Sequence, residues 1–455
     1  MNQTFTKREK IKQIVVLLIP ILITQLGMFS MVFFNTIMSG RYNASDLAAV
    51  AIGTSIWNPI FIGLSGILLA VSPIAAQRFG EKKNKEVSSI VTHGVYLALI
   101  IALIIIVLGV FFLDFILTRL NLDPYVHQTA YQYLTGLSYG IIPLFIFNVL
   151  RSFIYALGKT RVVMVILLSS LPVNFLLNYG LIFGAFGLPE LGGVGAGYAT
   201  SITYWIISII TFFIIKTKEP FSSHFHLKDF KQFSLSKSME ILKIGVPMGL
   251  SVFFETSIFA VVTILISKFS ITTIAAYQSA LNIVSFLYMI PISISMALTV
   301  LVGFEVGAGR NKDAKTYSWL GINLSIIIAL VTGILVIIFR ETVASLYSND
   351  DAVIKLTAHF LIYALFFQVS DAIQATAQAA LRGYKDVNIA FVMTLIAYWG
   401  ICLPVGYGLA HTNLGASGYW IGLTVGLLAA GVGLSWRLTH IQKTKFVSVE
   451  MKEVG

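Results

Sequence analysis

The chain has almost no cysteine and little charge, and both shortages exclude classes of protein. Cys402 is the one cysteine among 455 residues and lies in an apolar run, so neither a disulfide framework nor a cysteine-based zinc site is available. No nucleotide-binding motif of an ATP-driven pump is present. None of the seven histidines pairs with an acid in a recognisable metal or catalytic arrangement. We therefore expect neither enzymatic activity nor a cofactor.

Apolar residues dominate what remains. They make up 57% of the chain against 11% charged residues, and the mean hydropathy is +0.86, far above that of an ordinary soluble domain. Runs of about 20 apolar residues, long enough to cross a bilayer, occur in twelve places. Their approximate ranges are 14–38, 47–77, 88–113, 131–157, 162–186, 193–215, 241–267, 273–303, 317–339, 352–381, 387–410 and 415–436. The pattern predicts an all-α polytopic membrane protein with twelve transmembrane helices.

The basic residues support this count and give an orientation. A net charge of +11 is spread over many loops and forms no single patch, so nucleic acid is not an expected partner. Assigning alternate loops to one side places 26 of the 31 basic residues there. The five on the other side are Arg41, Arg119, Lys268, Arg340 and Lys355. By the positive-inside rule, both termini are expected in the cytoplasm, in a multi-pass protein of the cell (inner or plasma) membrane.

The chain also contains an internal repeat. A shift of 227 residues aligns Pro20 with Pro247, and the segment 79–86 with 306–313, without a gap. The longest polar stretch lies between the two copies. We therefore expect a six-helix lobe over 1–215, a cytoplasmic linker over 216–240, a second six-helix lobe over 241–438 and a cytoplasmic tail over 439–455. Six spans per copy imply the same orientation, hence pseudo-twofold symmetry about the membrane normal and a cavity between the lobes.

Two acidic residues lie near the middle of predicted spans. Glu255 is about 12 residues, or roughly 18 Å of helix, from the nearest flanking lysines, and Asp371 is roughly 16 Å from Arg382. A charge at such depth is costly and is usually functional. Burial favours the protonated carboxyl group, which makes it a proton carrier unless a cation keeps it ionised. The alternative, hydrogen bonding to a neighbouring helix, is available to uncharged residues at lower cost.

At this point the chain resembles the multidrug and toxic compound extrusion (MATE) family, in its bacterial NorM-like branch. The likeness rests on the two six-helix halves, on the segments 47–53 and 307–313, and above all on Glu255 in span seven with Asp371 in span ten. In that branch these carboxylates belong to the cation site of a Na⁺- or H⁺-driven drug antiporter. The resemblance implies export of amphipathic, often cationic drugs or toxins by alternating access, with Na⁺ held at this pair where Na⁺ is the coupling ion.

One position departs from the branch. Its members usually carry an aspartate in span one, in a stretch like 33–40, where this chain has Asn35. An amide does not exchange a proton near neutral pH, so this position offers no titrating group.

Several uncharged polar residues are weaker candidates for contacts with substrate or for lining a cavity. Gln278 and Asn282 lie four apart on span eight and so share a helix face. Asn174 and Asn178 have the same spacing on span five and are candidates, with Asn35, for lining the N-terminal lobe. Packing between helices explains each of these residues equally well.

Two aromatic residues are candidates of the same kind. Phe259 and Phe367 are placed to offer cation–π contacts to lipophilic cations, although in a chain with 33 phenylalanines any one is more often used for packing. We expect the protein to act as a monomer in the lipid bilayer. The alternative function is a flippase for lipid-linked oligosaccharides from the same superfamily. A flippase would favour a strongly cationic cavity, whereas spans one, seven, eight and ten lack deep lysine or arginine.

Overall fold

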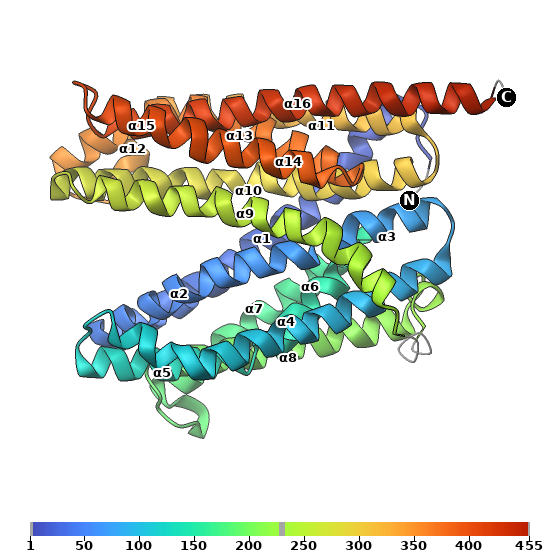
Figure 1. The fold of residues 1–455 in the computed structure, drawn as a ribbon. Coiled ribbons are helices and arrows are strands. Elements are labelled where there is room, and N and C mark those ends of the chain that lie inside the picture. Colours follow the sequence, from blue (N-terminus) through green and yellow to red (C-terminus); the bar gives the residue numbers. More distant parts are fainter. Residues whose placement is uncertain (1–2, 227–232, 454–455) are drawn as a thin grey trace. The chain divides into compact units, whose positions relative to one another are not determined.

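The computed structural model of the protein describes residues 3–226 and 233–453. Residues 227–232 of the predicted linker and the last two residues of the predicted tail lie outside the described part. All regular elements within the described ranges are helices, with no strand (Figure 1). Eleven of them are long and apolar enough to cross a membrane, and a bent pair forms a twelfth candidate span. The prediction of an all-α polytopic membrane protein is therefore confirmed.

Contacts divide the chain into two compact units. Ile19–Gly249 form the unit called here the N-terminal unit, and residues up to Leu18 join Leu250–Gly455 in the C-terminal unit. The predicted lobes place these boundaries differently. The first residues of the chain lie with the C-terminal unit, and the start of the helix after the linker lies with the N-terminal unit.

The N-terminal unit contains most of the first helix, seven further α-helices and the start of the ninth. These are α1 (Lys7–Tyr42), α2 (Ala44–Leu68), α3 (Val71–Gly80), α4 (Asn84–Thr118), α5 (Pro124–Ser138), α6 (Ile141–Ala156), α7 (Thr160–Phe183), α8 (Gly193–Thr217) and α9 (Leu235–Ile266). Short 3₁₀ turns follow α7 at Ala185–Gly187 and α8 at Ser222–His224.

The fourth predicted span, 131–157, is not one straight helix. It corresponds to α5 and α6, which meet at an angle of 47°. The helix also starts earlier than predicted, because Asp123 caps it by accepting a hydrogen bond from the Tyr125 amide (2.9 Å) and Pro124 fits its first turn. Gly140 lies at the bend, where a Cβ atom would be 2.7 Å from the Cα atom of Ser201. The bend therefore lets α6 approach α8 closely.

A buried aspartate fixes the start of α8. Asp46 is fully buried in the first turn of α2. Its carboxylate accepts hydrogen bonds from the Gly193 amide (2.8 Å) and from the Tyr125 hydroxyl (2.8 Å). A negative charge at a helix N-terminus is favourable because unpaired amides and the helix dipole meet it there. Asp46 thus ties α2, α5 and α8 together, and its charge has a structural use.

The start of α9 packs against α2 through glycines. A Cβ atom on Gly245 would lie 2.3 Å from the carbonyl oxygen of Ile67, and one on Gly249 would lie 2.7 Å from that of Gly63. The two backbones therefore touch, which only glycine permits at such a crossing. This contact explains why α9 belongs to the N-terminal unit as far as Gly249.

The C-terminal unit is built around one long helix. Its elements after α9 are α10 (Ile271–Gly307), α11 (Asn311–Ile338), α12 (Arg340–Ser345), α13 (Asp351–Gly383), α14 (Val387–Leu395), a π-helical segment (Ile396–Cys402), α15 (Leu403–Ala410) and α16 (Ser417–Glu453). α13 packs against α10, α11 and α16 (Figure 1). Tyr277, Phe360 and Trp420 are fully buried where these helices meet. α16 extends beyond the predicted last span, 415–436.

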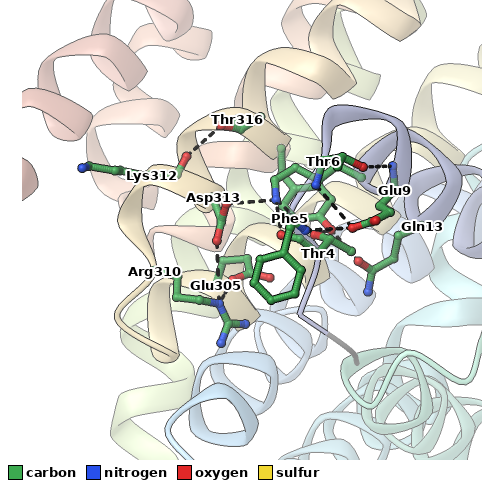
Figure 2. Close-up of polar contacts among 12 residues, drawn as sticks. Thr4, Phe5, Thr6, Glu9, Gln13, Glu305, Arg310, Lys312, Asp313 and Thr316 are labelled. Atoms are coloured by element: carbon green, nitrogen blue, oxygen red, sulfur yellow. Dashed lines mark hydrogen bonds and ion pairs between the residues drawn. The ribbon is translucent and has the colours of Figure 1, made fainter.

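The first residues of the chain are held on α11 by polar contacts (Figure 2). The Lys10 ammonium is 2.9 Å from an Asp313 carboxylate oxygen and donates to the Thr4 carbonyl oxygen (2.7 Å). The Tyr317 hydroxyl contacts Gln13 and lies 2.7 Å from the Thr4 hydroxyl. The Lys10 side chain is only 3% exposed. These contacts place the start of α1 in the C-terminal unit.

The N-terminal unit contains a matching arrangement. Lys237, which the 227-residue shift aligns with Lys10, donates from its ammonium to the Ser89 hydroxyl (2.6 Å) in α4. Glu240 lies 3.3 Å from the Arg78 guanidinium at the end of α3. α4 and α11 begin at Asn84 and Asn311, also 227 residues apart. Each repeat thus begins with a helix whose first turns pack on the third-span helix of the other copy.

The surface of the helices suits a lipid environment. On α4, Val110 is 73% exposed and Phe111 is 74% exposed, and Phe115 on the same helix is exposed as well. Soluble proteins rarely expose apolar side chains in such contiguous groups. The exposed faces therefore fit the hydrocarbon core of a bilayer.

Candidate functional site

The two predicted acidic residues lie in the same unit and act on each other. Glu255 on α9 is 8% exposed and Asp371 on α13 is 5% exposed. Their carboxylates interact electrostatically. The Tyr288 hydroxyl on α10 donates to Glu255 Oε1 (3.4 Å), and Gln374 is a second hydrogen-bonding partner of Glu255. Three helices, α9, α10 and α13, therefore converge on one buried acidic site.

A polar stripe on α13 continues from this site. Asp371, Gln374, Gln378 and Arg382 follow one another at intervals of three, four and four residues, which places them on one helix face. Gln374 Nε2 donates to Gln378 Oε1 (3.4 Å), and Arg382 Nη2 donates to the same oxygen (2.9 Å). Both glutamines are buried. The stripe thus links the acidic site to a guanidinium.

The apolar pattern and the depth of the charges do not single out Gln374, Gln378 and Arg382, although their spacing from Asp371 places them on one helix face. In the sequence, Arg382 stands one residue past the predicted end of span ten, 352–381. Side chains on an α-helix lean toward its N-terminus, so the Arg382 guanidinium folds back over Gln378 and toward Asp371. Its charge acts on Glu255. The expectation concerned deep basic residues, and Arg382 lies at the end of α13, with its side chain hydrogen-bonded to Gln378 one turn earlier.

The predicted asparagines of the N-terminal unit meet on α8. Asn35 Nδ2 donates to the Thr200 hydroxyl (2.8 Å), and Asn174 Nδ2 donates to the Thr203 hydroxyl (3.1 Å). Asn178 Nδ2 donates to Asn174 Oδ1 (3.1 Å). All three asparagines are buried, and Thr200 and Thr203 lie three residues apart, on one side of α8. The structure therefore brings the three predicted amides together in one cluster.

Two oxygens in this cluster are unsatisfied. Oδ1 of Asn35 and Oδ1 of Asn178 have no hydrogen-bond partner among the residues that the structure describes. A buried amide oxygen without a partner carries a desolvation cost that a bound water, ion or ligand relieves. The hydrogen bonds described for these three asparagines involve threonine hydroxyls and asparagine oxygens, and none of them involves a carboxylate.

The other predicted contact residues lie in the C-terminal unit. Gln278 and Asn282 share a face of α10, with Gln278 half-buried and Asn282 exposed. Phe259 and Phe367 contact each other with ring centroids 6.0 Å apart. Phe367 is buried and also lies 5.9 Å from the Trp420 ring. In this structure Phe367 packs in the core of the unit, whereas Asn282 is accessible from outside it.

In the residues that the structure describes, no cluster of three or more His, Cys, Asp or Glu side chains has the arrangement of a metal site. The acidic site instead offers two carboxylates, the Tyr288 hydroxyl and amide oxygens. Carboxylate and amide oxygens are ligands for hard cations, and a carboxylate also takes up a proton.

Long apolar helices around a buried pair of acids define the chain as an integral membrane protein with an ionisable site inside its helical bundle. Comparison with known proteins places it more narrowly. The family model MatE matches residues 20–180 and 247–408, so the chain belongs to the MatE family. The two matches begin 227 residues apart, the same shift that aligns the internal repeat.

Relatives and solved structures agree with this assignment. The chain is 54% identical over 444 residues to the probable multidrug resistance protein NorM of Bacillus subtilis (strain 168), covering 97% of this chain and 98% of that protein. It is 52% identical to the protein of the same name in Bacillus licheniformis, again covering 97% and 98%.

Two solved structures have the same fold. A MATE protein crystallised in the bent conformation matches with a TM-score of 0.88 and 21% identity, over 97% of this chain and all 100% of that one. A multidrug resistance MATE family transporter of the MOP superfamily, in an outward-facing conformation, matches with a TM-score of 0.87 and 21% identity, over 97% and 100%. The prediction of a NorM-like member of the family is confirmed.

Proposed function

We propose that the protein exports amphipathic, often cationic small molecules across the cell membrane, and that inward movement of Na⁺ or H⁺ drives this export by alternating access. The names of its relatives, which describe multidrug resistance, support the choice of cargo. The observation that carries the proposal is the burial of Glu255 and Asp371 in one site. Their oxygens are placed to take up a proton or a sodium ion in turn.

The chemistry follows from the cost of burying charge. Two ionised carboxylates in a low-dielectric site repel each other, and this repulsion is relieved when a cation or proton enters. Binding of the ion thereby changes the free energy of the site by several kcal/mol. A site with this property favours different helix arrangements when it is empty and when it is filled, which is what coupling of ion entry to drug exit requires.

A transport assay on the reconstituted protein tests the proposal. Efflux of ethidium, a fluorescent cation, is measured in proteoliposomes under separately imposed Na⁺ and H⁺ gradients. Glu255→Gln and Asp371→Asn remove charge with little change in volume, and each is expected to abolish gradient-driven efflux while protein yield stays near that of the wild type. Glu341→Gln, which alters an exposed acid on α12, serves as the control. Wild-type efflux by Glu255→Gln would remove that residue from the coupling site.

A further inference from the structure

The acidic site contains a charge imbalance that Arg382 partly corrects. Glu255 and Asp371 supply two negative charges when both are ionised. In membrane-buried surroundings such charges are kept only when paired or when they bind an ion. Arg382 is half-buried at the end of the α13 stripe, and its guanidinium interacts electrostatically with Glu255. One positive charge therefore faces two negative ones.

The link between Arg382 and the carboxylates is built from buried amides. Arg382 Nη2 is held by Gln378 Oε1 (2.9 Å), and the same oxygen accepts from Gln374 Nε2 (3.4 Å). Gln374 in turn bonds Glu255. These contacts connect Arg382 to the acidic site along one face of α13.

Gln374 adds a second feature. Its side chain is fully buried, and its Oε1 atom has no hydrogen-bond partner within the described ranges. Amide and carboxylate oxygens are the ligands that hard cations prefer. The free oxygen belongs to the residue that lies between Asp371 and Gln378 on the polar stripe and that hydrogen-bonds Glu255, so it is a candidate ligand for an ion at the carboxylates.

We propose that Arg382 is a positioning residue of the acidic site, directed by Gln378 and Gln374. Its positive charge balances one carboxylate and lowers the affinity of the site for the coupling ion. This inference rests on the proposed function of Glu255 and Asp371. With one carboxylate balanced, the site accepts one further positive charge, either one proton or one Na⁺. Arg382 speeds the release of that ion, because its positive charge repels the ion while it is bound.

The direction of the effect on ion affinity follows from this repulsion. A unit charge about 10 Å away, through an effective dielectric constant of about 20, changes the binding constant of a cation by roughly tenfold. Removing the Arg382 charge should therefore tighten ion binding. Half-maximal coupling is then reached at roughly tenfold lower Na⁺, or at about one pH unit higher if the ion is a proton. Maximal efflux should fall, because release of the ion becomes slow.

Other titratable groups that face Glu255 would also contribute to the measured pH dependence if they changed their charge. They are Asp371 on α13, Tyr288 on α10 and Tyr398 in the π-helical segment. The two tyrosines are neutral near physiological pH in any ordinary setting. Changes in the pH or Na⁺ profile after substitution of Arg382 therefore report on the two carboxylates.

The test measures ethidium efflux in proteoliposomes as a function of Na⁺ concentration and of pH. Arg382→Gln should shift the half-saturating ion concentration downward, and Arg382→Lys, which keeps the charge, should leave it close to the wild-type value. Lys355→Gln removes an exposed charge from the opposite end of α13 and serves as the matched control. A purely structural role for Arg382 would lower protein yield and maximal efflux in both Arg382 variants without moving the half-saturation point, and that result overturns the proposal.

A second variant keeps the test decisive if Arg382→Gln does not accumulate. Gln378→Glu places a carboxylate against the guanidinium and neutralises it in place, so it should shift half-saturation in the same direction. Different results would contradict the proposed coupling site and the proposed role of Arg382. If Glu255→Gln retains ion-driven efflux, the proposed coupling site is wrong. If Glu255→Gln loses it while Arg382→Gln and Gln378→Glu leave half-saturation unchanged, only the role given to Arg382 is wrong.

Discussion

Lys10 and Asp313 form a 2.9 Å ion pair between the first turns of α1 and the first turns of α11, and the lysine side chain is almost completely buried. The pair lies 303 positions apart in sequence. It holds the beginning of the chain in the C-terminal unit, although most of α1 lies in the N-terminal unit.

The ion pair should stabilise the folded protein measurably. Asp313→Asn leaves the buried Lys10 ammonium with the Thr4 oxygens but without an anion. Hydrogen bonds to charged groups contribute about 1.5–3 kcal/mol. Because Asp313 is partly exposed and screened, we expect a loss of about 1–2 kcal/mol, read as a lower Tm of the detergent-solubilised protein. Lys12→Gln, at an exposed position on the same helix, is the control. Equal Tm values for Asp313→Asn and the control would show that the pair contributes nothing.

The glycine contact between α9 and α2 should tolerate no side chain. Gly249→Val places a Cβ atom 2.7 Å from the Gly63 carbonyl oxygen, a backbone atom that cannot move aside without separating the helices. Overpacking of this kind costs typically 1–3 kcal/mol or more, so the yield of folded protein and its Tm should both fall. Gly109→Val on α4, where a Cβ atom meets nothing within 4 Å, is the matched substitution. If both variants fold equally well, the close crossing is not needed.

Asn35 offers a test of which unit carries the coupling. Asn35→Ala removes the hydrogen bond to Thr200 but no ionisable group. It should change drug affinity while leaving the Na⁺ or pH dependence of efflux largely intact. Glu255→Gln should instead alter the Na⁺ or pH dependence of efflux while leaving drug affinity largely intact. Both variants are compared in everted vesicles. Loss of ion dependence in Asn35→Ala, with its retention in Glu255→Gln, would move the coupling site to the N-terminal unit.

The loop-charge bias predicts the orientation of the chain. A reporter active only in the cytoplasm, fused after Gly455, should be active, because 26 of 31 basic residues lie on the side that then faces the cytoplasm. A second reporter inserted after Asn349, between α12 and α13, should be inactive. The opposite pattern in both fusions would invert the topology, and activity in both would break the twelve-span assignment.

Most of the fold could be predicted from the apolar runs, because each bilayer-spanning helix must be long and continuous in composition. Composition does not show where a span bends or how far a helix continues past its apolar run. The bend between α5 and α6 lies where Gly140 comes close to Ser201, a contact between segments distant in sequence. α16 likewise continues past the end of its apolar run because helix propensity does not require apolar residues.

The candidate site was predictable in its charges and less so in its uncharged partners. Glu255 and Asp371 stood out because buried acids are rare in membrane helices. Gln374 and Gln378 carry no charge and were overlooked, although their spacing from Asp371 placed them on the same helix face. Arg382 was assigned to a loop because its position in sequence marks the end of the span, whereas its side chain turns back along the helix.

The first turns of each repeat pack on a helix of the other repeat, so dividing the chain into two halves would affect both. A fragment ending before the linker would lack residues 233–249, which complete the N-terminal unit, and would carry residues 3–18 without the α11 surface that holds them. The complementary fragment has the opposite defects. We therefore expect that neither half folds well alone, and that two separately encoded halves accumulate only when they are synthesised together.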